Sequence, residues 1–264
     1  FIDAHIEVID CREFGMPQKR KRMIAGNYNF DQLNSYKKQF MTRSLGEVVA
    51  VFKKNEYIDP IYNKRSKDLT DHALEDCLDK ETVRINKSMK VAHPIYNKMS
   101  FPDNLNKPSR TITATCTKVS RESIIVKQGK GYRRLTVRER ASIQTFPIDF
   151  QFSGKSYSSK LKMIGNAIPP KLTYLLAQSM LGRGHKDFDL ATDYKNLKLK
   201  PNAQAKSSEP EKSNGHYRKK RKFTYAIPRL RFGSGVRFQL NNHFKRNQTK
   251  WVVEYFFGSS KNIM

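Results

Sequence analysis

The stretch Ile164-Gly165-Asn166-Ala167-Ile168-Pro169-Pro170 decides how the second half of this chain folds. A Gly-Asn pair marks a turn, and proline suits the first position of a helix, where its missing N–H is not needed. Apolar residues at helical spacing follow, namely Leu172, Leu175, Leu176 and Met180. Gly182 is placed to end the helix. The stretch therefore predicts a turn followed by an amphipathic helix.

An earlier helix start lies in Thr136-Val137-Arg138-Glu139, which has the pattern of a capping box. The threonine caps the first turn, and the glutamate three residues on bonds back to the cap. We expect this helix to end before Phe146-Pro147. Arg138 and Glu139 are assigned to structure, through capping, ion pairing and bracing.

A basic edge is predicted near the start of the chain. The alternating stretch Ile6-Glu7-Val8-Ile9-Asp10 and the apolar Met23-Ile24-Ala25-Gly26 are typical of strands, and Gln18-Lys19-Arg20-Lys21-Arg22 lies between them. In extended backbone, one face would carry Gln18, Arg20 and Arg22, and the other would carry Lys19 and Lys21. Such an edge suits contact with phosphates or bases, but a solvated basic edge strand that discourages aggregation is an equal alternative.

The charge of the chain points to a polyanionic partner. Its 264 residues include 51 Lys and Arg against 24 Asp and Glu, a formal net charge of +27. Such an excess repels itself unless a polyanion is near, so nucleic acid is the expected partner. The alternative is a soluble basic protein that has no polyanionic partner. An anionic membrane surface lacks support, because the sequence contains no apolar run of membrane-spanning length.

The cysteines predict reduced thiols rather than a metal site. Cys11, Cys77 and Cys116 lie far apart, without CxxC or Cys/His spacing, so we expect no metal and an intracellular protein. The chain starts at Phe1 without a signal peptide, and we expect this residue to be a cut inside a larger protein or gene.

Other regions give weaker predictions. Residues 31–51 have a weak helical pattern, and Leu69 to Leu78 predicts a short helix capped by Thr70-Asp71. Residues 111–117 and 123–126 are typical of strands. A polar segment from Lys198 to Gly215 predicts a linker. Alternating aromatic residues beyond it indicate a basic β appendage, which either faces DNA or packs as a structural addition.

In this order, the segments resemble the C-terminal half of the C5-cytosine DNA methyltransferases. Gly15 to Arg22 is similar to the Gln-x-Arg-x-Arg motif at the edge of the catalytic domain. Arg134 to Arg140, followed by Gln144-Thr145-Phe146-Pro147, is similar to the motif that braces the target-recognition domain. Gly165 to Pro170 is similar to the closing motif of the cofactor pocket, and Lys107 to Ala114 to the tail of the recognition domain.

The resemblance implies an α/β fold. It would comprise a partial S-adenosylmethionine-dependent methyltransferase domain (its last strands and closing helix), a mixed α+β target-recognition domain and a basic β-rich C-terminal extension. The expected boundaries are 1–26 for the end of the catalytic domain, 27–132 for the recognition domain, 133–184 for the bracing and closing helices, 185–217 for a linker and 218–264 for the extension. The first part alone would leave an open sheet edge and an uncovered apolar face, so we expect poor stability without a partner.

The resemblance also implies a chemistry. In this family a cysteine thiolate attacks C6 of a cytosine flipped out of double-stranded DNA, and C5 then takes the methyl group of S-adenosylmethionine. By similarity, Arg22 would help hold the flipped cytosine and its sugar-phosphate. Gln18 and Arg20 would support that edge and nearby phosphates, with Lys19 also contacting DNA. Arg134, Thr136, Arg138 and Glu139 would form the structural brace.

Asn166, with Ala167, is the cofactor-binding candidate that the resemblance implies. Its amide can donate to and accept from a polar ligand, and the following helix start favours a carboxylate such as that of the methionine moiety. A plain turn into a helix is the alternative.

The family's nucleophile lies in a Pro-Cys dipeptide, and none of the three cysteines here follows a proline. We therefore expect this chain alone not to methylate DNA. Its expected role is the C-terminal part of a DNA (cytosine-5-)-methyltransferase, in a prokaryotic cytoplasm near the nucleoid. The N-terminal catalytic half would come from the same gene or a separate subunit. The alternatives are a non-catalytic DNA-binding relic and an RNA-binding basic protein.

Overall fold

The computed structural model describes residues 4–53, 57–67, 69–91, 99–154, 156–196, 207–208, 224–226, 237–241 and 251–256. Its elements, in chain order, are β1 (His5–Asp10), η1 (Cys11–Phe14), β2 (Lys21–Gly26), α1 (Phe30–Ser35), η2 (Tyr36–Gln39), α2 (Leu45–Val51), β3 (Tyr57–Ile58), β4 (Arg65–Ser66), α3 (Lys80–Val91), β5 (Ile125–Gln128), β6 (Gly131–Arg134), α4 (Val137–Ile143), α5 (Tyr157–Asn166), α6 (Pro170–Met180), α7 (Leu190–Asn196), β7 (Thr224–Ala226), β8 (Arg237–Asn241) and β9 (Val252–Phe256).

The chain divides into two compact units, residues 1–211 and 212–264. In the described part of the first unit, helices pack with three separate two-stranded antiparallel sheets, β1–β2, β3–β4 and β5–β6. The second unit contains the antiparallel sheet β7–β8–β9, in line with the strands expected in the C-terminal extension. Mixed helices and small sheets of this kind are consistent with an α/β methyltransferase-like domain.

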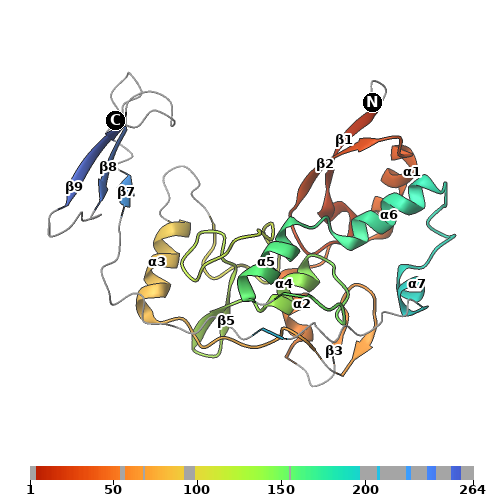
Figure 1. Ribbon diagram of the computed structural model, residues 1–264. Coiled ribbons are helices and arrows are strands. Elements are labelled where there is room, and N and C mark those ends of the chain that lie inside the picture. The colour runs from red at the N-terminus through yellow and green to blue at the C-terminus, as the bar shows by residue number, and fades with distance from the viewer. Residues whose placement is uncertain are drawn as a thin grey trace. The chain divides into compact units, whose positions relative to one another are not determined.

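The first core joins the β1–β2 hairpin to α1 and α6 (Figure 1). It buries Ile9, Phe14, Leu33, Leu172 and Leu175, among others. The predicted helix after Pro169-Pro170 is thus confirmed, although Met180 at its end is exposed. Helices α1 and η2, which follow the expected boundary at residue 26, also contribute Phe30, Leu33 and Tyr36 to this core.

The outer face of the hairpin is apolar and exposed. Ile9 and Ile24 point into the core, whereas Ile6, Val8 and Met23 on the other face are 60%, 64% and 69% exposed. Val8 and Met23 are direct cross-strand partners, so their side chains lie together on that face. This part of the chain therefore presents a contiguous apolar surface to solvent.

The second core lies between α2, α4, α5 and the β5–β6 hairpin, at the centre of Figure 1. It buries Val48, Ile112, Leu135, Ile143 and Leu161, among others. The capping box predicted at Thr136 and Glu139 is confirmed, since both of its hydrogen bonds are present. Helix α5, which the sequence analysis missed, is also capped, by Ser156.

Two predicted elements are wrong. Residues 111–117 form no strand, and residues 69–78 form no helix. In the latter segment, buried Asp71 pairs with Lys160 and Glu75 pairs with Arg134, and these long-range ion pairs replace helical geometry. Within the range 185–217 of the expected linker, α7 buries Tyr194 against the ring of Tyr62.

Candidate nucleic-acid interface

The predicted basic edge runs beside the segment that follows Pro108. Residues Gln18 and Ser109 form a parallel bridge, and the Lys19 N–H donates to the Ser109 carbonyl at 2.7 Å. The Ser109 N–H in turn donates to the carbonyl of Pro17 at 2.9 Å. The hydroxyl of Thr111 donates to the Lys19 carbonyl at 2.6 Å. Two of the segments predicted from sequence therefore lie side by side.

Gln18 lies inside the protein, with no exposed surface. Its amide nitrogen donates to the Gln144 side-chain oxygen at 2.5 Å and to the Ile143 carbonyl at 3.2 Å. Its amide oxygen accepts from the Ile112 N–H at 3.3 Å. Gln18 therefore ties the edge to the C-terminal end of α4, because it satisfies buried polar groups on two other segments.

Arg20 is also buried and joins three segments through backbone carbonyls. It donates to Ile112 at 3.0 Å, to Gly165 at 3.0 Å and to Ala167 at 2.9 Å. Burial, together with the nearby charge of Arg22, lowers the pKa of Arg20 to about 10, so the side chain remains a cation at neutral pH. A planar guanidinium can reach all three acceptors at once, and a lysine could not reproduce this geometry.

Gly165 makes the joint between these segments close. A Cβ atom at this position would lie 2.2 Å from the Ala114 nitrogen and 2.3 Å from the Thr113 carbonyl carbon. The backbone at the end of α5 therefore packs directly on the segment 113–114, and any side chain would separate them. Arg140 adds a hydrogen bond to the Thr113 carbonyl at 2.8 Å.

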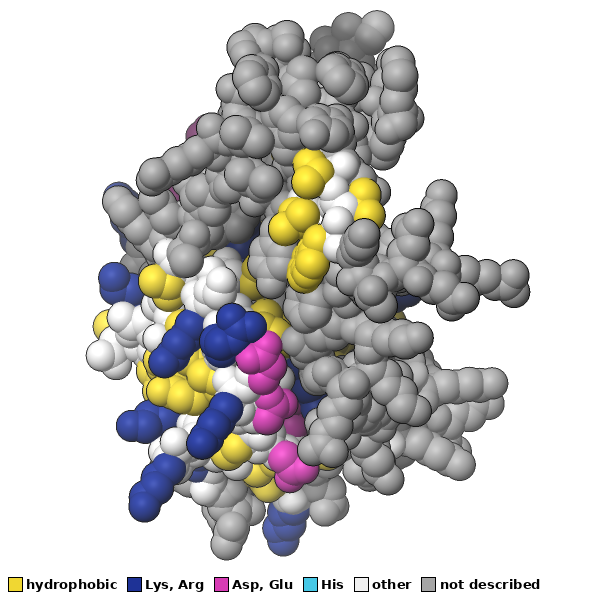
Figure 2. Space-filling model, turned by 90° about the vertical axis from the view of Figure 1, so that its left-hand side faces the viewer, with side chains coloured by type: hydrophobic (Ala, Val, Ile, Leu, Met, Phe, Trp, Pro, Cys, Tyr) yellow, Lys and Arg dark blue, Asp and Glu magenta, His cyan; other side chains and the backbone are white. Residues whose placement is uncertain are grey.

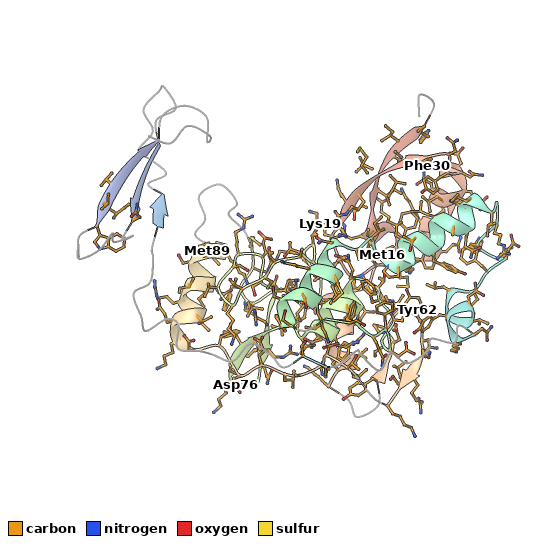
Figure 3. The ribbon with its side chains drawn as sticks, in the orientation of Figure 1. Met16, Lys19, Phe30, Tyr62, Asp76 and Met89 are labelled. Carbon is orange, nitrogen blue, oxygen red and sulfur yellow. The ribbon has the colours of Figure 1, made fainter. Side chains whose placement is uncertain are left out.

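Gln18 and Arg20, which were expected to support this edge and nearby phosphates, are thus both buried. The face that they share is the predicted one, but it points inward, because buried carbonyl groups of other segments need donors. Lys19 and Lys21 are exposed on the opposite face, and Arg22 at the end of this stretch is half-buried (Lys19 is labelled in Figure 3).

The exposed cations border a shallow pocket of about 470 Å³, which is lined by Lys19, Lys21, Arg22, Met99, Arg110, Thr111 and Glu122. Arg110 is already neutralised, because its Nε donates to Asp103 at 2.8 Å. In the described part of the chain no carboxylate lies within ion-pair distance of Lys19, Lys21 or Arg22. These three cations are therefore available to a polyanion.

Further cations lie on α3, where Lys80, Arg84 and Lys87 are exposed. Arg84 pairs with Glu81 on the same helix at 2.7 Å. Figure 2 shows a face of the molecule on which Lys and Arg side chains project around a smaller group of acidic ones. The basic character of the chain is thus not confined to the edge at Lys19.

Two of the predicted brace residues, Arg134 and Glu139, lie in buried ion pairs. The Arg134 guanidinium forms two hydrogen bonds with the Glu75 carboxylate, and a third joins it to the Cys116 carbonyl. Arg133 pairs with Glu139 at 2.6 and 2.7 Å. These contacts connect the β6–α4 corner to segments far away in sequence, and none of these groups is exposed enough to meet a ligand.

Arg138 and Thr136 complete this network. Arg138 is buried and donates to the Thr70 carbonyl at 2.9 Å and the Phe150 carbonyl at 2.6 Å. Thr136, besides capping α4, has its hydroxyl 3.1 Å from Nδ1 of His72. Burial lowers the pKa of His72, because it disfavours the charged imidazolium form.

Asn166 is the last residue of α5, and Ala167 follows it in the connection to α6. The Asn166 side chain is exposed, whereas the Ala167 carbonyl accepts from both Arg20 and Gln144, the latter at 2.7 Å. The Asn166 amide is therefore accessible to a polar ligand, while the backbone of Ala167 is engaged in holding the turn.

The cysteines do not form a nucleophilic site. Cys11 and Cys116 are buried, and burial raises the pKa of the Cys11 thiol to about 11. Cys77 is exposed on the loop before α3. No group of three metal-binding side chains occurs in the described residues. In the same residues no helix is long and apolar enough to cross a membrane.

Sequence reasoning missed two contributors to the site. Ser109 and Thr111 hold the basic edge through backbone contacts, and only the distant pairing reveals this role. Lys160 and Asp71 form a buried pair at 2.6 Å beneath α5. The sequence signal that could have revealed this pair is Lys160 itself, a lysine among the buried apolar residues of α5.

Comparison with known proteins identifies the family. Residues 3–182 match the family described as C-5 cytosine-specific DNA methylase, so this chain belongs to that family. It is 27% identical over 188 residues to the Type II methyltransferase M.PspPI of Psychrobacter sp., covering 66% of this chain and 45% of that protein. It is 47% identical over 58 residues to M.AquIB of Picosynechococcus sp., covering 18% of this chain and 42% of that protein.

A shorter match, 52% over 48 residues, is to M.HgiDI of Herpetosiphon aurantiacus and covers 18% of this chain and 15% of the relative. The chain thus spans less than half the length of the curated relatives that it matches.

Proposed function

We propose that this chain is the C-terminal portion of a DNA (cytosine-5-)-methyltransferase of a restriction-modification system. It would supply target recognition, DNA clamping and part of the cofactor pocket. The observation that carries the proposal is the joint at Arg20, where three of the four segments of the family resemblance meet through hydrogen bonds to Ile112, Gly165 and Ala167. A joint that fixes these segments together sets the basic edge and the Asn166 turn in one rigid piece.

The basic edge is the proposed DNA contact. Lys19, Lys21 and Arg22 carry charges without acidic partners among the described residues, and cations of this kind bind backbone phosphates. Arg22 is the residue that would hold the flipped cytosine and its sugar-phosphate, since a guanidinium makes paired, charge-assisted hydrogen bonds. Gln18 and Arg20 would act indirectly, by holding this edge in place.

Asn166 is the proposed cofactor contact. Its exposed amide can both donate and accept, which fits the amino and carboxylate groups of S-adenosylmethionine. When bound, the cofactor supplies the methyl group that C5 of cytosine receives. The role of this chain would be to present Asn166 at the α5–α6 turn, which Arg20 and Gln144 fix through the Ala167 carbonyl.

The N-terminal catalytic portion of the family is the proposed partner. It would cover the outer face of the β1–β2 hairpin, where Ile6, Val8 and Met23 expose most of their surface. Removing apolar surface from water contributes about 25 cal/mol per Å², so this face favours association. The relatives are more than twice as long as the segments that match, which leaves room for such a portion in the family.

A chimera would test the methyl-transfer proposal. The matching part of M.PspPI is replaced by this chain, and transfer of labelled methyl groups from S-adenosylmethionine to DNA is measured. We expect activity from the chimera, none from this chain alone, and a loss of at least tenfold for Arg22→Ala. Lys162→Ala, which removes an exposed cation on α5, is the matched control and should leave activity unchanged.

The competing function is a DNA-binding module without chemistry, favoured by the net charge of +27. Both functions predict that the chain binds duplex DNA with an affinity that falls as salt rises. They differ in the chimera: an inactive chimera that is folded and still binds DNA would favour the module.

A further inference from the structure

A second pocket, of about 570 Å³, lies in the first unit between residues 39–43 and residues 185–191. It shares no residue with the pocket at the basic edge. Phe40, Ile61 and Phe188 provide apolar parts of its wall, and Lys171 also lines it. The pocket therefore combines an apolar lining with a cation, a combination that no role assigned above uses.

Lys171 is buried within this lining. The residue is 4% exposed, and its ammonium lies 3.8 Å from the centre of the Phe40 ring. Among the described residues, no carboxylate lies within 4.0 Å of this ammonium. Two other buried lysines of this unit have acidic partners: Lys160 pairs with Asp71, and Lys90 pairs with Asp103. Lys171 differs from these lysines, because its ammonium makes a cation–π contact with Phe40. Such a contact offsets only a small part of the free-energy cost of burying an ammonium group.

The other charged groups around the pocket do not neutralise Lys171. Arg43 is a second cation in the wall, and its charge adds to the effect of burial, which lowers the pKa of Lys171 to about 7. Glu47 is engaged by the Ser44 N–H and by Arg43. Asp189 is engaged by the Ala191 N–H and the Thr192 hydroxyl. His185, the remaining titratable group in the wall, adds no negative charge.

We propose that this pocket binds a small organic or inorganic oxyanion, with a carboxylate or phosphate group on the Lys171 ammonium. An anion at this position would supply the missing counter-charge of Lys171 and reduce its repulsion from Arg43. Phe40 and Phe188 would pack against any apolar part of the ligand. Because Lys171 is almost completely buried, a free small molecule can approach it, whereas a phosphate on a rigid DNA duplex cannot.

The test is calorimetric titration of the full 264-residue chain at pH 7 and constant ionic strength, in separate arms with inorganic phosphate and with benzoate. We expect saturable binding of one equivalent in at least one arm, and the arm that binds tells phosphate from carboxylate chemistry. Because Lys171 is only partly protonated near its pKa, binding should also take up protons, seen as a heat that depends on the buffer.

The matched variants are Lys171→Met and Lys162→Met. We expect at least tenfold weaker binding for Lys171→Met and unchanged binding for Lys162→Met, whose lysine is exposed on α5. Lys171→Met removes an unpaired buried charge while keeping the length of the side chain, so its melting temperature should not fall. A second readout needs no variant: the probe should raise the pKa of Lys171, measured from the NMR shifts of its ε-methylene group. Absence of binding in both arms, or equal binding by the two variants, would overturn the proposal.

Discussion

The ammonium of Lys160 lies 2.6 Å from the Asp71 carboxylate, and both side chains are completely buried. This pair fixes α5 to the segment before α3, and the same carboxylate also accepts from the Ser208 N–H at 3.0 Å. A buried ion pair of this kind contributes little more to folding stability than a well-packed apolar pair would. Loss of one partner, however, leaves the charge of the other buried without its counter-charge, which is strongly destabilising.

Asp71→Ala should therefore lower the free energy of unfolding by about 3–5 kcal/mol, because the Lys160 ammonium would remain buried. Urea denaturation of the full chain measures this loss. The control is Arg84→Ala, which breaks the exposed pair with Glu81 and should cost no more than about 0.5 kcal/mol. If the two variants lowered the free energy of unfolding equally, burial of the Lys160–Asp71 pair would not make its loss more costly than that of an exposed pair.

Arg20→Lys and Arg22→Lys should differ in their effect on the stability of the chain. Loss of the Arg20 contacts removes the donor to the carbonyl groups of Ile112 and Gly165, at a cost of about 1–3 kcal/mol in stability. Arg22→Lys should leave stability within about 0.5 kcal/mol of the original. Thermal melts check both expectations.

Replacing Arg22 by alanine should instead reduce the salt dependence of DNA binding. If Arg22 contacts one phosphate, the slope of log K against log salt should fall by about 1. Fluorescence anisotropy with a duplex at several salt concentrations measures this slope. An unchanged slope would place Arg22 outside the DNA contact, and Lys162→Ala serves as the control for an exposed cation elsewhere.

Gly165→Ala should be among the most damaging small substitutions in the first unit. The new methyl group would lie 2.2 Å from a backbone nitrogen of Ala114, which cannot move without opening the joint. We expect a loss of more than about 3 kcal/mol, or failure to fold, by circular dichroism. Gly129→Ala meets nothing within 4 Å and, at a positive φ of 56°, should cost only about 1–2 kcal/mol. A smaller loss at Gly165 than at Gly129 would contradict the close packing.

His72 should make stability dependent on pH. Its pKa in the folded chain is lowered by burial, so the folded state takes up its proton at a lower pH than the unfolded state does. The free energy of unfolding should therefore fall as pH drops below about 6.5, the ordinary value for histidine. His72→Gln should flatten this part of the profile. His5→Gln, which replaces an exposed histidine, is the control and should leave this pH dependence unchanged. If His72→Gln also left it unchanged, His72 would not be the group responsible.

Local signals predicted the parts of the fold that depend on local physics. The capping box at Thr136 and the prolines before α6 each satisfy the backbone of a single helix end, and both helices are present where expected. The alternation of Gln18, Lys19 and Arg20 likewise follows from extended backbone alone.

The remaining features depend on distant partners. Alternation shows that Gln18 and Arg20 share a face, but not that this face meets the carbonyl groups of Ile112 and Ala167. The failed helix at residues 69–78 has the same origin, because Glu75 finds its partner 59 residues further on, in Arg134. Single-sequence patterns contain no information on such pairings.

The joint at Arg20 also bears on how the protein is made. Its acceptors lie 92 residues further along at Ile112 and 147 residues further along at Ala167. Because the ribosome makes a protein from its N-terminus, the hairpin must stay without the second of these acceptors until 147 further residues are synthesised. Contacts of such long range slow folding and leave apolar surface exposed meanwhile. We therefore expect yield in the cell to depend on chaperones more strongly than on the stability of the finished protein.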